Sequence, residues 1–182
     1  MAKLLLGPLL RHVGERDATV WVETDVPCDV EIRAGSGHGQ DRTFTAAGHH
    51  YEIVVVTDLP AAAATPYEVR LDDEPVWPPA GSVYPPSRIR TIDPSRPIRM
   101  LFGSCREVAG RHARGATRPA PDVLIAFATR MIAQDRAQWP DLVVFLGDQV
   151  YADDTSPAVQ DFIRSRRDIK LPPKGEVANF EE

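Results

Sequence analysis

Four residues in two short stretches of the sequence have side chains that can bind a metal ion or a phosphate. Cys105 and Arg106 closely follow the apolar run IRMLF, while Asp148 and Tyr151 follow the apolar run DLVVFLG. A thiolate, a carboxylate and a phenolate at one place suit a hard or borderline cation such as ferric iron. An arginine beside such a cation can bind a phosphate through two parallel N–H groups. These four residues form the candidate site.

The elements around these residues predict that the two stretches meet. IRMLF (98–102) predicts a short buried strand, and DLVVFLGD (141–148) predicts a second strand whose lack of alternation is typical of cover on both faces. Between them, residues 121–139 predict a helix because apolar residues occur at positions 124, 127, 128, 131 and 132. Strand, helix and strand in this order predict a right-handed βαβ unit with parallel strands. Since such strands end at the same sheet edge, we expect Cys105 and Asp148 to lie close together.

The segments FGSCR (102–106) and DLVVFLGDQVYAD (141–153) resemble the start of the catalytic domain of the PhoD-like alkaline phosphatases, in the calcineurin-like metallophosphoesterase superfamily. The resemblance implies that Cys105, Asp148 and Tyr151 are metal ligands, with Asp148 bridging iron (Fe3+) to calcium or another divalent metal. It also implies hydrolysis of phosphate monoesters or diesters, with Asp148 and Arg106 as catalytic residues. In such sites the ions neutralise the phosphate oxygens and activate the attacking water.

Residues 1–92 have the pattern of an antiparallel β domain. The β-prone runs are 18–23, 29–34, 43–46, 51–57 and 67–71, separated by turn-rich pieces such as GSGHGQ at 35–40. Tyr67, after a proline-marked corner, resembles the tyrosine corner of immunoglobulin and fibronectin III sandwiches. The sequence leaves open which face Trp21 occupies, because Val20 and Val22 compete for the interior.

We therefore predict a mixed fold in two parts. An all-β immunoglobulin/fibronectin III-like sandwich covers 1–92, and a linker covers 93–97. The first βαβ part of an α/β metallophosphoesterase domain then covers 98–182. The family resemblance implies the same order, with the sandwich before the catalytic domain.

The sequence after Asp148 lacks the usual further ligands of a metallophosphoesterase. All five histidines precede Asp148, and the one asparagine is Asn179. We therefore expect an N-terminal fragment that is inactive alone and carries part of a metal site. Its partners would be a phosphate ester substrate and the downstream half of the catalytic domain. We also expect an exposed apolar surface after residue 97.

Each candidate residue also has a purely structural interpretation. Cys105 can be a small buried apolar side chain, and Asp148 can stabilise a turn or cap a helix. Tyr151 can be a loop aromatic packed over the strand. Arg106 belongs to an arginine-rich segment, 96–118, which can be a solvated loop and lacks the interleaved aromatics of a nucleic-acid patch.

A second helix is predicted over 156–168. Ser156 is its expected N-cap, and Pro157 is expected at the first helical position. Asp153 and Asp154 are interpreted as acids that favour the start of this helix rather than as ligands.

The overall composition excludes several classes of protein. The net charge of −5 gives no case for a nucleic-acid partner. Pro8 interrupts the apolar start MAKLLLGPLLR, which we interpret as an edge strand and not a signal peptide. No stretch reaches the ~20 apolar residues of a membrane span. We therefore expect a cytoplasmic protein, in which Cys28 and Cys105 are reduced thiols.

Two other functions compete with phosphate ester hydrolysis. The sandwich can be a non-catalytic binding or interaction module, with the α/β part serving as a docking surface. A thiol or redox enzyme that uses Cys105 is the weaker alternative, because no histidine or second cysteine neighbours Cys105 in the sequence. Metal analysis together with a phosphate ester assay distinguishes these possibilities.

Overall fold

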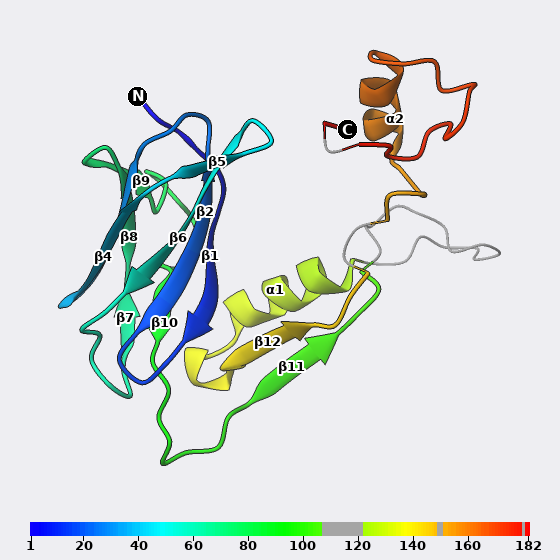
Figure 1. Ribbon diagram of the computed structural model, residues 1–182. Helices are drawn as coiled ribbons and strands as arrows, with labels where there is room; N and C mark the ends of the chain where they lie inside the picture. The colour runs from blue at the N-terminus through cyan, green and yellow to red at the C-terminus, as the bar shows by residue number, and fades with distance from the viewer. Residues whose placement is uncertain (107–121, 149–150, 180) are drawn as a thin grey trace. The chain divides into compact units, whose positions relative to one another are not determined.

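The computed structural model describes residues 1–106, 122–148, 151–179 and 181–182 (Figure 1). The chain divides into two compact units, Met1–Pro97 and Ile98–Glu182. The described structure is mostly β, with 38% of residues in strands and 13% in helices. In the described part of the chain, neither helix is long and apolar enough to cross a membrane.

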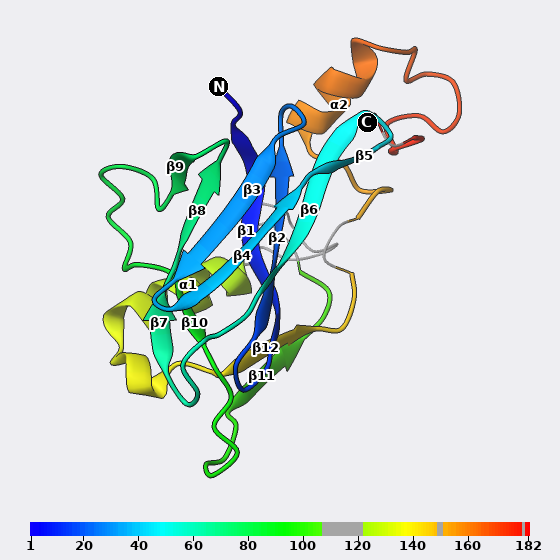
Figure 2. The same ribbon diagram turned by 60° about the vertical axis from the view of Figure 1, so that its left-hand side comes forward.

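The first unit consists of antiparallel sheets, an arrangement compatible with a β-sandwich (Figure 2). One four-stranded sheet has the order β1-β2-β6-β5, and the other has the order β4-β3-β8-β9. A separate two-stranded sheet pairs β7 with β10. The strands are β1 (Leu4–Val13), β2 (Ala18–Thr24), β3 (Asp29–Ala34), β4 (Gly37–Arg42), β5 (Phe44–Ala46), β6 (His49–Val56), β7 (Ala64–Pro66), β8 (Glu68–Leu71), β9 (Glu74–Trp77) and β10 (Arg88–Arg90).

The core of this unit is filled by alternating side chains from both four-stranded sheets. In β2, Val20 and Val22 are fully buried, and so Trp21 between them faces outward. In β3, Ile32 is fully buried in the same cluster. Tyr67 directly precedes β8 and is also buried there. The sequence left open which face of the strand Trp21 occupies, and the burial of Val20 and Val22 decides it.

The glycines of segment 35–40 predicted a turn. The segment is only partly a turn, because strand β4 begins at Gly37. Gly35 has φ 64° and turns the chain between β3 and β4, which pair from Asp29↔Arg42 to Ala34↔Gly37. At Gly39 a β-carbon would collide with the carbonyl group of Val55, in β6 of the other sheet. The glycines therefore allow a close approach between the two sheets within a strand.

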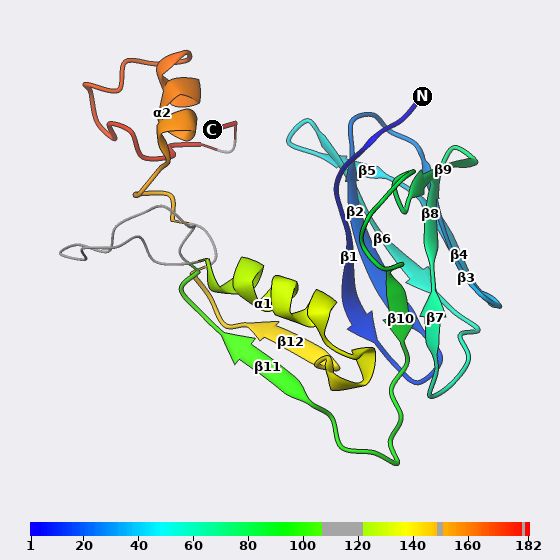
Figure 3. The ribbon, with the colours of Figure 1, turned by 180° about the vertical axis from the view of Figure 1, so that it is seen from behind.

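The second unit contains a parallel strand pair and two helices. Its elements are β11 (Met100–Gly103), α1 (Val123–Ala133), the 3₁₀ turn η1 (Arg136–Gln138), β12 (Leu142–Phe145) and α2 (Pro157–Arg164). β11 and β12 pair in parallel, and α1 lies between them in the chain and runs alongside them in Figure 3. In α1, Leu124, Phe127 and Met131 are half-buried, as their helical spacing predicted, whereas Ala128 and Ile132 of the same predicted face are exposed.

The expected burial of β11 and β12 on both faces is wrong. Met100, Phe102 and Leu142 are 54%, 64% and 47% exposed, and the register places Met100 beside Leu142. The two-stranded sheet of β11 and β12 has two faces, and α1, which runs alongside it, covers only one of them. An exposed apolar surface after residue 97 is therefore present, as the sequence predicted.

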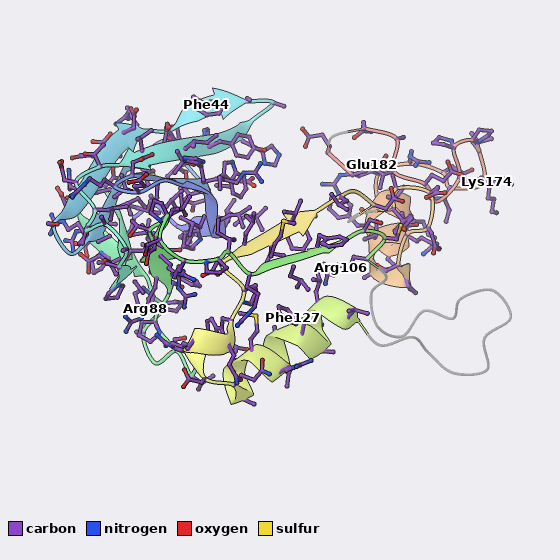
Figure 4. The ribbon with its side chains drawn as sticks, turned by 90° about the horizontal axis from the view of Figure 1, so that it is seen from below. Phe44, Arg88, Arg106, Phe127, Lys174 and Glu182 are labelled. Carbon is purple, nitrogen blue, oxygen red and sulfur yellow. The ribbon has the colours of Figure 1, made fainter. Side chains whose placement is uncertain are left out.

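The last segment folds around α2 and one arginine. Ser156 caps α2 by accepting a hydrogen bond from the Val159 N–H at 3.3 Å, and Pro157 is the first helical residue, as predicted. The first turn of α2 holds no acidic residue, because Asp153 and Asp154 precede the cap. Arg167 donates to the Glu182 carboxylate at 2.8 Å (Figure 4, where Glu182 is labelled).

Candidate functional site

Cys105 and Asp148 lie side by side just beyond the ends of β11 and β12. The Cys105 thiol donates to Asp148 Oδ2 at 3.3 Å. The backbone of the two segments also pairs here: the Cys105 N–H donates to the Gly147 carbonyl at 3.1 Å, and the Arg106 N–H donates to the Asp148 carbonyl at 2.9 Å. These bonds extend the strand pairing and hold the two side chains at the same edge of the sheet.

The backbone at this edge is strained. Cys105 and Asp148 have φ of 59° and 50°, in the left-handed region that side chains with a β-carbon rarely adopt. Such conformations cost about 1–3 kcal/mol each and cluster at functional sites, where the surrounding structure maintains them. Among the described residues, no atom lies within 4 Å of a β-carbon added at Gly103 or at Gly147, so none of them crowds this edge. A ligand can therefore approach the backbone at this edge.

The pair offers two of the ligands that a metal ion needs. Cys105 is exposed, and its Sγ lies 3.3 Å from Ser104 Oγ as well as from the Asp148 carboxylate. Thiolate and carboxylate together suit iron or zinc better than magnesium. Across the residues that the structure describes, no three His, Cys, Asp or Glu side chains form a group able to hold a metal. The fit to a metal is therefore partial, because a protein site usually supplies three or more ligands.

Arg106 is bound to a buried carboxylate at the start of α1. Its Nη2 and Nε donate to Asp122 Oδ2 at 2.8 and 3.3 Å, and the Asp122 side chain is only 1% exposed. Asp122 Oδ1 accepts from the Leu124 and Ile125 N–H groups, so the same carboxylate caps α1. The Arg106 guanidinium lowers the pKa of Asp122, with the two backbone bonds acting in the same direction.

Asp122 is the site residue that our sequence reasoning missed. The signal was present, because an aspartate directly before an apolar helical run is a typical N-cap. Its pairing with Arg106 had no such signal, since residues 107–121 separate the two positions. Most of the arginine-rich segment lies in 107–121, outside the described residues.

Tyr151 is the remaining candidate residue of the site. The hydrogen bonds described above connect Cys105, Asp148 and Arg106, and none of them includes Tyr151. Its side chain is 40% exposed. Gln149 and Val150, which connect it to Asp148, lie outside the described residues.

The fold and the site thus define an antiparallel β unit followed by a parallel strand–helix–strand unit that carries a thiol–carboxylate pair. Residues 1–89 match a protein family described as "Domain of unknown function (DUF7800)". No curated protein and no solved structure matches the chain.

The resemblance to the PhoD-like alkaline phosphatases is therefore wrong as an identification. The family comparison finds only the domain at residues 1–89, and neither a PhoD-like nor a metallophosphoesterase family matches. Ligand-binding residues at the ends of parallel strands occur in α/β proteins of many functions. The segments FGSCR and DLVVFLGDQVYAD can therefore resemble segments of a family without the chain being a member of that family.

Proposed function

We propose that the second unit contributes Cys105 and Asp148 to a metal site that hydrolyses phosphate monoesters or diesters. The supporting observation is the 3.3 Å contact between the Cys105 thiol and the Asp148 carboxylate, at the end of two parallel strands. This edge is where α/β sheets commonly bind ligands. Both residues also have a left-handed backbone, a conformation that occurs at functional sites as well as in turns.

In this proposal Cys105 and Asp148 would hold a cation such as ferric iron, and Asp148 would also be a ligand of calcium or another divalent ion. When bound, such ions act as Lewis acids on the oxygens of a phosphate ester. The pair alone supplies too few ligands. We therefore include Tyr151 and a downstream chain segment, the proposed partner, as sources of the others.

Arg106 is proposed to bind the phosphate while Asp122 positions it. The bonds from Nη2 and Nε to Asp122 fix the guanidinium at the start of α1, while the Arg106 backbone N–H donates to the Asp148 carbonyl. A guanidinium has five N–H donors, so the ion pair with one carboxylate oxygen leaves donors for a phosphate. Asp122 has no proposed contact with the substrate.

The proposal is tested first by metal binding to the 182-residue chain. We expect Asp148→Asn and Cys105→Ser each to weaken iron binding by at least about tenfold, because each removes an anionic ligand. The measurement is metal content after equilibrium dialysis against a series of iron concentrations. Asp153→Asn is the matched control, since Asp153 lies close in sequence, is exposed and has no proposed ligand role.

Unchanged iron binding in both ligand variants would contradict the metal site. Hydrolysis of p-nitrophenyl phosphate and of its bis ester is then measured on the full gene product that includes the downstream segment. There, Asp148→Asn should remove metal and turnover together. Full metal content without turnover on either ester would contradict the proposed reaction while retaining the metal site.

A second candidate function, a non-catalytic interaction module, is favoured by the first unit. One outer face of its sheets is apolar and exposed, as described below. A chain that binds no metal and yet associates through this face would support that function in place of hydrolysis.

A further inference from the structure

The outer face of the sheet β1-β2-β6-β5 is apolar. Strand register places Leu9 beside Trp21 and Trp21 beside Ile53, while Phe44 lies beside Tyr51 in the neighbouring row. We call the outward side chains of these strands the apolar face; its main members are Leu6, Leu9, Trp21, Phe44, Ile53 and Val55. Trp21 is half-buried, and the other five side chains are between 46% and 57% exposed. Phe44 is labelled on β5 in Figure 4.

The outer face of the other four-stranded sheet is charged. Glu31 accepts hydrogen bonds from Arg33 and His38 at 2.7 and 2.9 Å, and Arg70 adds an ion pair at 3.5 Å. Antiparallel sheets usually place polar residues on the side away from the core. One sheet of this unit follows that rule and the other does not. The apolar face is therefore a specific feature of the sheet β1-β2-β6-β5 and not the general surface of the unit.

The apolar face contains one carboxylate, which is already paired. Glu23 is only 6% exposed, and its Oε1 lies 2.6 Å from His49 Nδ1. Tyr51 stacks on His49 and on Trp21, with ring centroids 6.0 and 5.9 Å apart. At the far end of the face, His12 Nε2 lies 3.9 Å from Asp17 Oδ2. The centre of the face thus presents no unpaired charge among the described side chains.

These features decide which partner fits best. An acidic or basic partner would bring charge that the centre of this face cannot pair, and burying unpaired charge is costly. A sugar would require open ring faces, whereas Trp21, Tyr51 and His49 stack against one another. The matching surface is itself apolar and free of unpaired charge. A second copy of the same face has both properties.

We propose that the apolar face binds the apolar face of a second copy of the chain. The result is a two-fold symmetric dimer in which the two β1-β2-β6-β5 sheets pack face to face. Such a contact is self-complementary, and homodimer interfaces are more apolar than other protein surfaces. Packed sheets lie about 10 Å apart, so side chains such as Ile53 and Leu9 meet across the interface. This proposal does not depend on the metal site.

The test is the oligomeric state of the complete 182-residue chain, measured by sedimentation equilibrium over a concentration series. We expect a dimer, and we expect Ile53→Lys and Leu9→Lys each to raise its dissociation constant by at least about 100-fold, because each buries an unpaired charge. Both side chains are about half exposed in the monomer, so neither variant disturbs the core. Circular dichroism confirms that the variants remain folded.

Two matched controls carry the same change on other exposed apolar residues. Val83→Lys lies in the loop between β9 and β10, and Phe102→Lys lies on the exposed surface of the second unit. Both should dimerise as the original chain does. A chain that stays monomeric up to about 1 mM would overturn the proposal, because even weak specific contacts form by then. So would a dimer that Phe102→Lys dissociates and Ile53→Lys does not.

Discussion

At the scale of single residues, three buried carboxylates of this protein are each held by a cationic or imidazole partner. Asp122 is paired with Arg106, Glu31 with Arg33 and His38, and Glu23 with His49. A buried carboxylate without such partners is strongly destabilising. The partners come from other positions along the chain, so each pair also joins two segments. The stability of the fold therefore depends on the charge of these carboxylates.

The Glu31 network predicts a loss of stability in acid. The hydrogen bond from Arg33, and then that from His38, lower the pKa of Glu31 below its ordinary value of 4.5. Because the folded pKa is the lower one, the stabilisation is complete above 4.5 and is lost as pH falls through the folded pKa. When the pH falls from about 7 to about 3, we expect the free energy of unfolding of Glu31→Gln to drop by about 1 kcal/mol less than that of the original chain. Urea unfolding at both pH values measures this difference, and equal losses would contradict it.

At the scale of elements, the two units differ in how completely their strands are covered. In the first unit, β2, β3 and β8 bury every second side chain against the opposite sheet. In the second unit, β11 and β12 have equally apolar sequences, yet Met100, Phe102 and Leu142 are exposed. Apolar sequences thus form strands in both units. Only the first unit has an opposite sheet that buries the apolar side chains of its strands.

A pair of valine substitutions tests the core of the first unit. Val69 in β8 is fully buried, whereas Val83 is 89% exposed. We expect Val69→Ala to lower the free energy of unfolding by about 2 kcal/mol, since it removes buried methyl groups and leaves a cavity. Val83→Ala should change it by less than about 0.5 kcal/mol. Thermal or urea unfolding followed by circular dichroism makes the comparison; similar effects at both sites would show that the buried cluster is wrongly assigned.

At the scale of the whole molecule, the chain combines a unit with a closed core and a unit with an open one. The first unit has a single cluster of fifteen buried residues, which include Val20, Ile32 and Val54. In the described part of the second unit, Ile163 is the one large apolar side chain that is fully buried. Local stability follows buried apolar contacts. The two units should therefore differ in how often they open.

Hydrogen exchange provides the test of this difference. We expect amides in β2, β3 and β6 to exchange at least about 100-fold more slowly than those in β11 and β12, because the latter open without exposing a large core. Mass spectrometry of peptides from the intact chain measures both sets in one sample. Equal protection of 98–182 and 1–92 would contradict the open core of the second unit.

Several features were determined by the sequence alone, because they depend on neighbouring residues. Alternation placed strand β3 at 29–34 with its observed bounds, and Ser156 with Pro157 marked the start of α2. The meeting of Cys105 with Asp148 also followed from the order of strand, helix and strand, since parallel strands end at one edge. These inferences needed only local periodicity and simple topology.

Other features were decided only by the tertiary structure, because they depend on what lies opposite in space. Two valines buried in the core turned Trp21 outward, and the close approach of Val55 gave Gly39 its role in β4. The partner of Arg106 proved to be Asp122, across a segment whose length hid the pairing from any local pattern. The burial of β11 and β12 was wrongly predicted for the same reason: a sequence shows that a strand is apolar, but packing determines whether anything covers it.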